Sequence, residues 1–214
     1  IFEKLRQSHS IPDLSSTKKY IISLGVALGM KYLHMQGIVH KNLKPYNILL
    51  DEKFYPRIYN FGLLKMSDEQ IEKILKESNS ENSIYLAPEI ISGESYSYKA
   101  DVYSYSYILY ELITGRKPTI ECEENTSLID NIKKGKRPDL SPIEDSEICK
   151  FLTLCWSNNS HERPTFGDIV NEILQEKFKK LFNVDKESID SYLTLFDEEL
   201  KQPNLLRSTS LNRI

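Results

Sequence analysis

His40-Lys41-Asn42-Leu43-Lys44-Pro45-Tyr46-Asn47 is the stretch from which the rest of this 214-residue chain can be interpreted. A short apolar run, Ile48-Leu49-Leu50, follows it directly, and Asn60-Phe61-Gly62 lies a short distance further on. Short apolar runs bounded by turn residues are typical of strands. We therefore expect a polar loop over 40–47, a strand over 48–50, a turn at 51–53 and a second strand over 57–59.

The octapeptide resembles the catalytic loop of protein kinases, H-R-D-L-K-P-x-N, and Asn60-Phe61-Gly62 occupies the place of D-F-G in that family. Ala87-Pro88-Glu89 resembles the A-P-E that ends the kinase activation segment. The apolar, tyrosine-rich run 101–115 is similar to the central helix of the kinase large lobe. Cys155-Trp156, followed by the R-P-T-F of 163–166, resembles the tyrosine-kinase-like group in particular.

The motifs cover roughly residues 1–180 and occur in the order that the family has. The resemblance implies a mainly α fold, the helical large (C-terminal) lobe of a protein kinase, with short β-hairpins at the catalytic loop. The β-rich small lobe, which forms the roof of the ATP cleft in this family, would lie before Ile1 and is absent from this chain. We expect 1–183 to form the lobe and 184–214 to form an amphipathic helix with a flexible tail.

Helices are expected from apolar periodicity. The first long one covers 18–36, with Ser16 or Thr17 as its cap. Gly25 and Gly29 lie four residues apart on it and indicate close helix packing, because the G-x-G-x-x-G of a phosphate loop is absent. The further helices are expected over 1–7, 100–115, 128–134, 147–156, 166–178 and 186–200.

The two acidic residues on which the kinase reaction depends are both asparagine in this chain. The resemblance places Asn42 at the loop aspartate that accepts the proton of the substrate hydroxyl. It places Asn60 at the D-F-G aspartate, a ligand of the Mg²⁺ that bridges the phosphates. An amide oxygen accepts hydrogen bonds but takes up no proton as a base, and it brings no charge to a hard dication.

Other residues of the same loop match the family. The resemblance implies that Asn47 is the second metal ligand and that Lys44 approaches the transferred phosphate. It implies that Leu49 belongs to the floor of the nucleotide site. Lys41 replaces the loop arginine, and it keeps the charge but loses the bidentate fork.

Four residues match structural positions of the family and are expected to act as structural anchors. His40 opens the catalytic loop, and Arg163 matches the arginine that pairs with the A-P-E glutamate, here Glu89. Asp101 stands at the start of the central helix, where the helix dipole and free amides favour a carboxylate. The departures from the family therefore fall on its chemistry and spare its framework.

Composition excludes several classes of protein. The net charge of −3 gives no basic face for nucleic acid, and no apolar run approaches the ~18–20 residues of a membrane span. Cys122, Cys149 and Cys155 lack C-x-x-C spacing, which is typical of reduced thiols in a cytoplasmic protein. The four histidines show no metal-ligand spacing.

Three functional hypotheses follow. The first is a catalytically impaired pseudokinase that serves as a binding or scaffold module for protein partners in signalling. The second is an active Ser/Thr protein kinase, acting on a protein substrate, whose small lobe comes from upstream sequence. The third is a degenerate product with no folded role. ATP and Mg²⁺ are the implied cofactors if a nucleotide binds at all, and the chain gives no indication of its oligomeric state.

Overall fold

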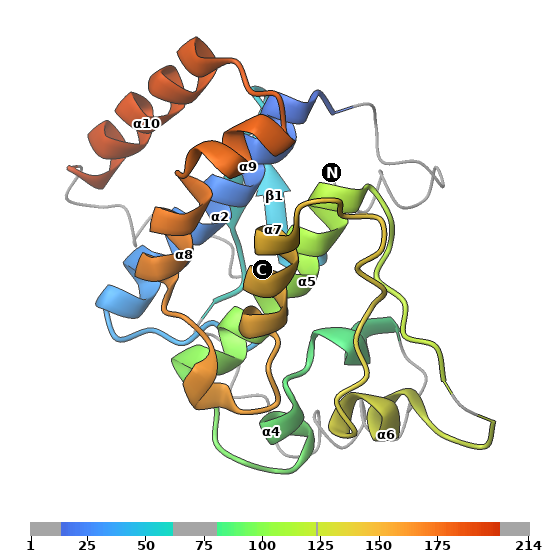
Figure 1. Ribbon diagram of the computed structural model, residues 1–214. Helices are drawn as coiled ribbons and strands as arrows, with labels where there is room; N and C mark the ends of the chain where they lie inside the picture. Colours follow the sequence, from blue (N-terminus) through green and yellow to red (C-terminus); the bar gives the residue numbers. More distant parts are fainter. Residues whose placement is uncertain (1–13, 62–80, 123, 202–214) are drawn as a thin grey trace.

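The computed structural model describes residues 14–61, 81–122 and 124–201 (Figure 1). The helix expected over 1–7, Gly62 and the tail after Lys201 lie outside these residues. The elements are α2 Ser16–Met35, η1 Pro45–Asn47, β1 Ile48–Leu50, β2 Pro56–Ile58, η2 Glu81–Tyr85, α4 Pro88–Ile91, α5 Tyr98–Thr114, α6 Leu128–Lys133, α7 Ser146–Cys155, η3 Ser160–Glu162, α8 Phe166–Ile173, α9 Glu176–Leu181 and α10 Lys186–Leu200. The prediction of a mainly helical large lobe is confirmed, and of the short β-hairpins expected at the catalytic loop the described residues contain one, β1–β2.

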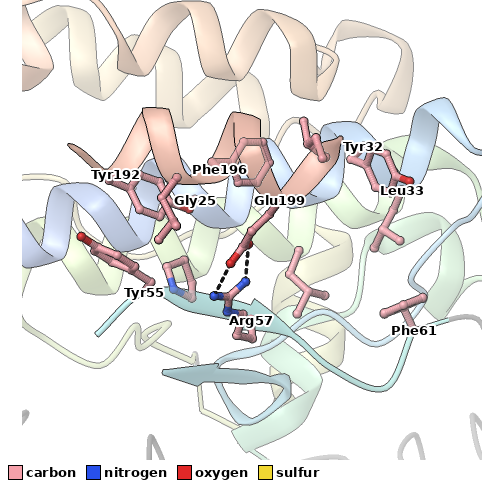
Figure 2. A pocket seen from close by; sticks show the side chains of 14 residues that line it. Gly25, Tyr32, Leu33, Tyr55, Arg57, Phe61, Tyr192, Phe196 and Glu199 are labelled. Atoms are coloured by element: carbon pink, nitrogen blue, oxygen red, sulfur yellow. Dashed lines mark hydrogen bonds and ion pairs between the residues drawn. The ribbon is translucent and has the colours of Figure 1, made fainter. Parts of the chain in front are cut away.

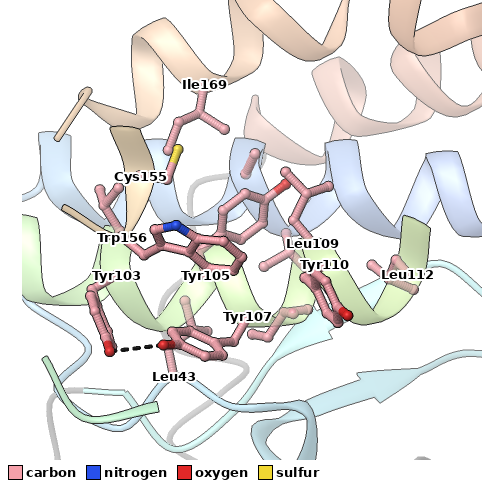
Figure 3. Close-up of a cluster of buried hydrophobic side chains, with 14 of the residues drawn as sticks. Leu43, Tyr103, Tyr105, Tyr107, Leu109, Tyr110, Leu112, Cys155, Trp156 and Ile169 are labelled. Carbon is pink, nitrogen blue, oxygen red and sulfur yellow. Dashed lines mark hydrogen bonds between the residues drawn. The ribbon is translucent and has the colours of Figure 1, made fainter. Parts of the chain in front are cut away.

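Helix α5 runs through the middle of the lobe and is buried over most of its length. It begins at Tyr98, two residues before the predicted start, because the Ser97 side chain caps it by accepting from the Lys99 amide. The hydroxyls of Tyr103 and Tyr107 hydrogen-bond to each other at 2.9 Å, so these polar tips are satisfied inside the core (Figure 3). The Tyr107 ring packs beside Trp156, which follows α7.

Helix α2 is the second central element and packs against α5, α8 and the hairpin. Our prediction of its cap was wrong: Ser15 is the N-cap, and its hydroxyl accepts from the Lys18 amide at 3.3 Å. Gly25 and Gly29 serve the close packing that their spacing predicted. A Cβ at Gly25 would lie 2.2 Å from the Tyr192 hydroxyl of α10, and one at Gly29 would lie 2.7 Å from Ile58 Cδ1 of β2.

Strands β1 and β2 form an antiparallel hairpin in which Leu49 pairs with Arg57. The second strand lies one residue earlier than predicted. Tyr59, expected inside the strand, instead donates its amide to the Asn47 carbonyl at 2.9 Å and so joins the catalytic loop. The turn is closed by Asp51, whose carboxylate accepts from the Lys53 and Tyr55 amides.

The C-terminal region contains one wrong prediction and one confirmed prediction. The single helix expected over 166–178 is two helices, because Gln175 has an extended backbone (ψ 152°) that ends α8 and starts α9. This change of direction brings Phe178 into the core beside Phe151. Helix α10 has the predicted bounds, and it lies across α2 at the opposite end of the lobe from α4 and α6 (Figure 1).

Candidate active-site loop

Asp101 of α5 holds the start of the catalytic loop. Its carboxylate accepts from the backbone amides of His40 at 2.8 Å and Lys41 at 2.9 Å, and it lies 2.9 Å from the His34 Nε2. We expected this carboxylate to serve the amides of its own helix, but Ser97 caps α5 and the three hydrogen bonds of Asp101 all reach other segments. A charged acceptor thus fixes the loop to the buried helix.

Lys41 has a left-handed backbone, with φ of 70°. This conformation is uncommon for a residue other than Gly or Asn, and such conformations cost of order 1–3 kcal/mol. The hydrogen bond from its amide to Asp101 offsets that cost. The strain therefore lies where the chain turns from His40 towards Asn42, and the anchor carboxylate holds it there.

His40 is buried, with 1% of its surface exposed. Burial lowers the pKa of its imidazole, while the nearby Asp101 carboxylate acts in the opposite direction. In the neutral form Nδ1 can accept a hydrogen bond, and the Asn42 amide lies 3.3 Å from it. His40 therefore orients the backbone of Asn42 as a positioning residue.

Asn47 connects the two halves of the candidate site. Its side-chain Nδ2 donates to the Asn42 carbonyl at 2.6 Å, and its own carbonyl accepts from the Tyr59 amide at 2.9 Å. Tyr59, the residue before Asn60, is thereby linked through Asn47 to the backbone of Asn42. Asn42, Asn47 and Tyr59 thus form one hydrogen-bonded assembly, and Asn60 follows Tyr59 in the chain.

The remaining predicted residues lie around this assembly. Asn60 has a left-handed backbone (φ 64°), a conformation that asparagine tolerates better than most residues. Leu49 projects a 44% exposed side chain from β1, and the Lys44 Nζ lies 6.0 Å from the Tyr46 ring centroid. Gly62 and the following segment lie outside the described residues.

The side chains of this site do not fit a strong Mg²⁺ centre. Because Nδ2 of Asn47 is used by Asn42, its Oδ1 is the atom left for a cation, and Asn60 offers one neutral oxygen at most. Mg²⁺ sites usually use one or two carboxylates. Among the residues that the structure describes, there is no cluster of three or more His, Cys, Asp or Glu side chains that could hold a metal.

The ion pair of Arg163 and Glu89 is a second anchor of the lobe. Arg163 is fully buried, and its guanidinium donates to both oxygens of Glu89 at 2.7 and 2.8 Å. The same group also donates to the carbonyls of Lys99 and Ser157, each at 2.9 Å. All three nitrogens of the guanidinium donate, so the buried charge of Arg163 is both paired with a carboxylate and hydrogen-bonded.

Sequence reasoning missed two groups of residues. His34 was assigned no role, although it follows the buried Met30 by one helical turn and so faces Asp101. Arg57 and Glu199 form a bidentate pair, with N–O distances of 2.5 and 2.7 Å, between β2 and α10. A signal for Glu199 was available, because it lies seven residues after Tyr192 on the apolar stripe of 186–200 and so needs a partner.

Comparison with known proteins places this geometry in context. The family model for protein tyrosine and serine/threonine kinases matches residues 3–173. A putative serine/threonine-protein kinase/receptor of Acanthamoeba polyphaga mimivirus is 33% identical over 174 residues, which cover 79% of this chain and 10% of that protein. A probable serine/threonine-protein kinase of Dictyostelium discoideum is 36% identical over 166 residues, covering 77% of this chain and 12% of that protein.

A serine/threonine-protein kinase of Arabidopsis thaliana is 29% identical over 179 residues, which cover 82% of this chain and 30% of that protein. The chain thus spans a tenth to about a third of the length of these relatives. Within 14–61, 81–122 and 124–201, none of the helices combines the length and apolar character needed to cross a bilayer.

Proposed function

The chain belongs to the protein tyrosine and serine/threonine kinase family, and from this premise we propose that it is the large lobe of a pseudokinase that binds protein partners in signalling. Members of the family generally use ATP and Mg²⁺ to phosphorylate a hydroxyl group. The observation that carries the proposal is that amides stand at position 42 of the catalytic loop and at position 60 after β2, while the loop is still anchored to Asp101.

The first argument for a pseudokinase is the loss of the general base at position 42. The amide of Asn42 accepts a hydrogen bond and can still orient a substrate hydroxyl, but it cannot take up the proton. A positioned general base contributes ~10²–10⁴-fold in rate. The loop geometry, with Asn42 held by His40 and Asn47, does not replace that contribution.

The second argument is the loss of the charged metal ligand at position 60. With neutral oxygens from Asn47 and Asn60, the chain supplies no charge to balance a dication between phosphates. Where ATP binds, Leu49 would contact it from the floor, and Asn47 and Asn60 would face its phosphates. We propose that any ATP binding depends weakly on Mg²⁺ or not at all. In the extreme case the chain binds neither ATP nor Mg²⁺.

A binding role suits what the chain keeps. The paired Arg163 and Glu89 and the Asp101 anchor preserve the shape of the lobe, so its helical surface can be presented to a protein partner. We place the lobe at 1–183 and an accessory unit, α10 with its tail, at 184–214. The free thiols of Cys122, Cys149 and Cys155 support a cytoplasmic setting for the protein. We propose no role for the chain in nucleic-acid or membrane binding.

The second candidate is an active Ser/Thr protein kinase. Lys44 and Asn47, which the family uses at the transferred phosphate and the second metal, are both present in this chain. In this case a small lobe from upstream sequence would complete the cleft.

A transfer assay separates the two candidates, using the protein at its natural length, [γ-³²P]ATP, Mg²⁺ and a mixture of Ser/Thr peptides. We expect the wild type to incorporate no more label than its Lys44→Met variant. The double variant Asn42→Asp/Asn60→Asp should gain at least ~10²-fold. Wild-type turnover that Lys44→Met abolishes would reject the pseudokinase and favour the active kinase.

A further inference from the structure

A cavity of about 170 Å³ lies between α10 and the surface made by α2 and β2 (Figure 2). Asn42, Asn47 and Asn60 do not line it, although Phe61 of Asn60-Phe61-Gly62 forms one end of its lining. Apolar and aromatic side chains make up most of the wall, including Leu33, Ile58, Phe196 and Leu200. Neither the catalytic residues nor the anchors use this space.

The cavity exists because the N-terminal half of α10 packs closely on the lobe and the C-terminal half does not. In the N-terminal half, Ile189 and Tyr192 are buried, and Tyr192 meets α2 at Gly25, where a side chain would collide with it. In the C-terminal half, Phe196 and Leu200 are only partly buried and border the open space. The helix is therefore anchored at one end and spans a gap at the other.

An ion pair closes the outer side of that gap. Arg57 of β2 makes a bidentate contact with Glu199 of α10, and it also lies 3.2 Å from Asp51. Figure 2 shows the Arg57 and Glu199 side chains pointing towards one another across the space below α10. Among the described residues that line the cavity, Arg57 is the one cation and Glu199 the one carboxylate, so this lining carries no net charge.

Size and polarity define the ligand. An apolar cavity of about 150 Å³ stays dry and takes up benzene, so the space beside α10 can hold one ring or two small fused rings. A nucleotide is larger and highly charged, and it does not match this space. We propose that the cavity is a binding site for a small, neutral aromatic molecule, with the C-terminal half of α10 as its movable wall. This inference does not depend on the proposed function, because it invokes neither ATP nor catalysis.

Glycine resonances give a direct test on the wild-type chain. The chain has eight glycines, and Gly25 and Gly29 both line the cavity. Selective ¹⁵N-glycine labelling and titration with indole should give saturable shifts of the Gly25 and Gly29 amide signals. The signals of Gly115 and Gly167, which lie outside the lining, should stay in place. No change at Gly25 and Gly29, or equal changes at all four, would overturn the proposal.

A filled cavity provides the second arm. Leu195→Trp places a large ring at the wall and should weaken indole binding at least about tenfold, equivalent to about 1.4 kcal/mol. Leu181→Trp makes the same change on α9, where the leucine is 38% exposed and outside the lining, and should leave binding unchanged. Undiminished binding to a folded Leu195→Trp would also overturn the proposal. Should that variant fail to fold, the glycine titration decides by itself.

Discussion

The carboxylates of Glu89 and Asp101 and the amides of Asn42 and Asn60 stand at motif positions where the kinase pattern has acidic residues. Their surroundings differ. Asp101 is buried and the Glu89 side chain is only 9% exposed, and each accepts at least two charge-assisted or amide hydrogen bonds from distant segments. Asn42 and Asn60 are half-exposed.

This difference shows which charges the fold itself requires. A buried carboxylate that is fully hydrogen-bonded cannot become an amide without leaving donors or a cation unmatched. A half-exposed carboxylate held for catalysis has no such partners within the chain, so its replacement leaves the fold intact. The four predictions below test this distinction, from the largest expected effect to the smallest.

The largest effect is expected for Glu89→Gln. This change leaves the buried Arg163 guanidinium without its counter-charge, which costs about 3–5 kcal/mol. For a chain of this size the melting temperature should fall by roughly 6–20 °C. Glu147→Gln is the matched control, because Glu147 pairs with Lys150 at the surface, where the side chains are 59% and 74% exposed. The control should stay within about 0.5 kcal/mol of the wild type. Urea unfolding measures both.

The opposite exchanges at Asp101 and Asn42 test the comparison most directly. Asp101→Asn should cost about 1.5–3 kcal/mol, because its amide cannot accept from the His40 and Lys41 amides and His34 as the carboxylate does. Asn42→Asp should change the free energy of unfolding by no more than about 0.5 kcal/mol. Equal destabilisation by the two variants would show that the catalytic position is also structural, and the distinction would fail.

A third prediction concerns the metal. In the natural-length protein, any rise in melting temperature on adding ATP should be the same in Mg²⁺ and in EDTA. Asn60→Asp should make the shift depend on Mg²⁺, with ATP binding about tenfold tighter when the metal is present, or about 1.4 kcal/mol. Asn125→Asp is a suitable control, since Asn125 has the same left-handed backbone (φ 62°) but lies exposed, away from the loop. A wild-type shift that requires Mg²⁺ would contradict our interpretation of Asn60.

The effect that is smallest at neutral pH appears only in alkali and concerns a group that the fold holds neutral, the Tyr20 hydroxyl. Burial, with a smaller contribution from Glu176, raises the pKa of Tyr20 to about 12. A raised pKa in the folded state gives stability that is complete below pH 10 and is lost as the pH rises from 10 towards 12. Tyr20→Phe should make this decline shallower by up to about 1.4 kcal/mol per pH unit.

Tyr98→Phe provides the control for the alkaline measurement. Tyr98 is 43% exposed, whereas the Tyr20 side chain is fully buried and donates to the Ile173 carbonyl at 3.0 Å. The decline of stability above pH 10 should be the same for Tyr98→Phe as for the wild type. If both variants reduced the slope equally, burial of Tyr20 would not be its cause.

Sequence by itself determined the family, the helical class and most of the helices. Long helices such as 16–35, 98–114 and 186–200 are visible in the chain because apolar periodicity records which face is buried. The catalytic-loop motif and the two asparagines within it are equally visible, since the identity of a side chain fixes whether it can act as a base or carry charge.

Only the tertiary structure decided which groups meet. The hydrogen-bond partners of Asp101 were not predicted, because a residue's place near a helix start does not reveal that another loop supplies its donors. The helix break at Gln175 depends on the packing of Phe178 in the core. The Arg57–Glu199 contact joins residues that are 142 positions apart in the chain. Such contacts depend on long-range packing, which local periodicity and motif spacing do not encode.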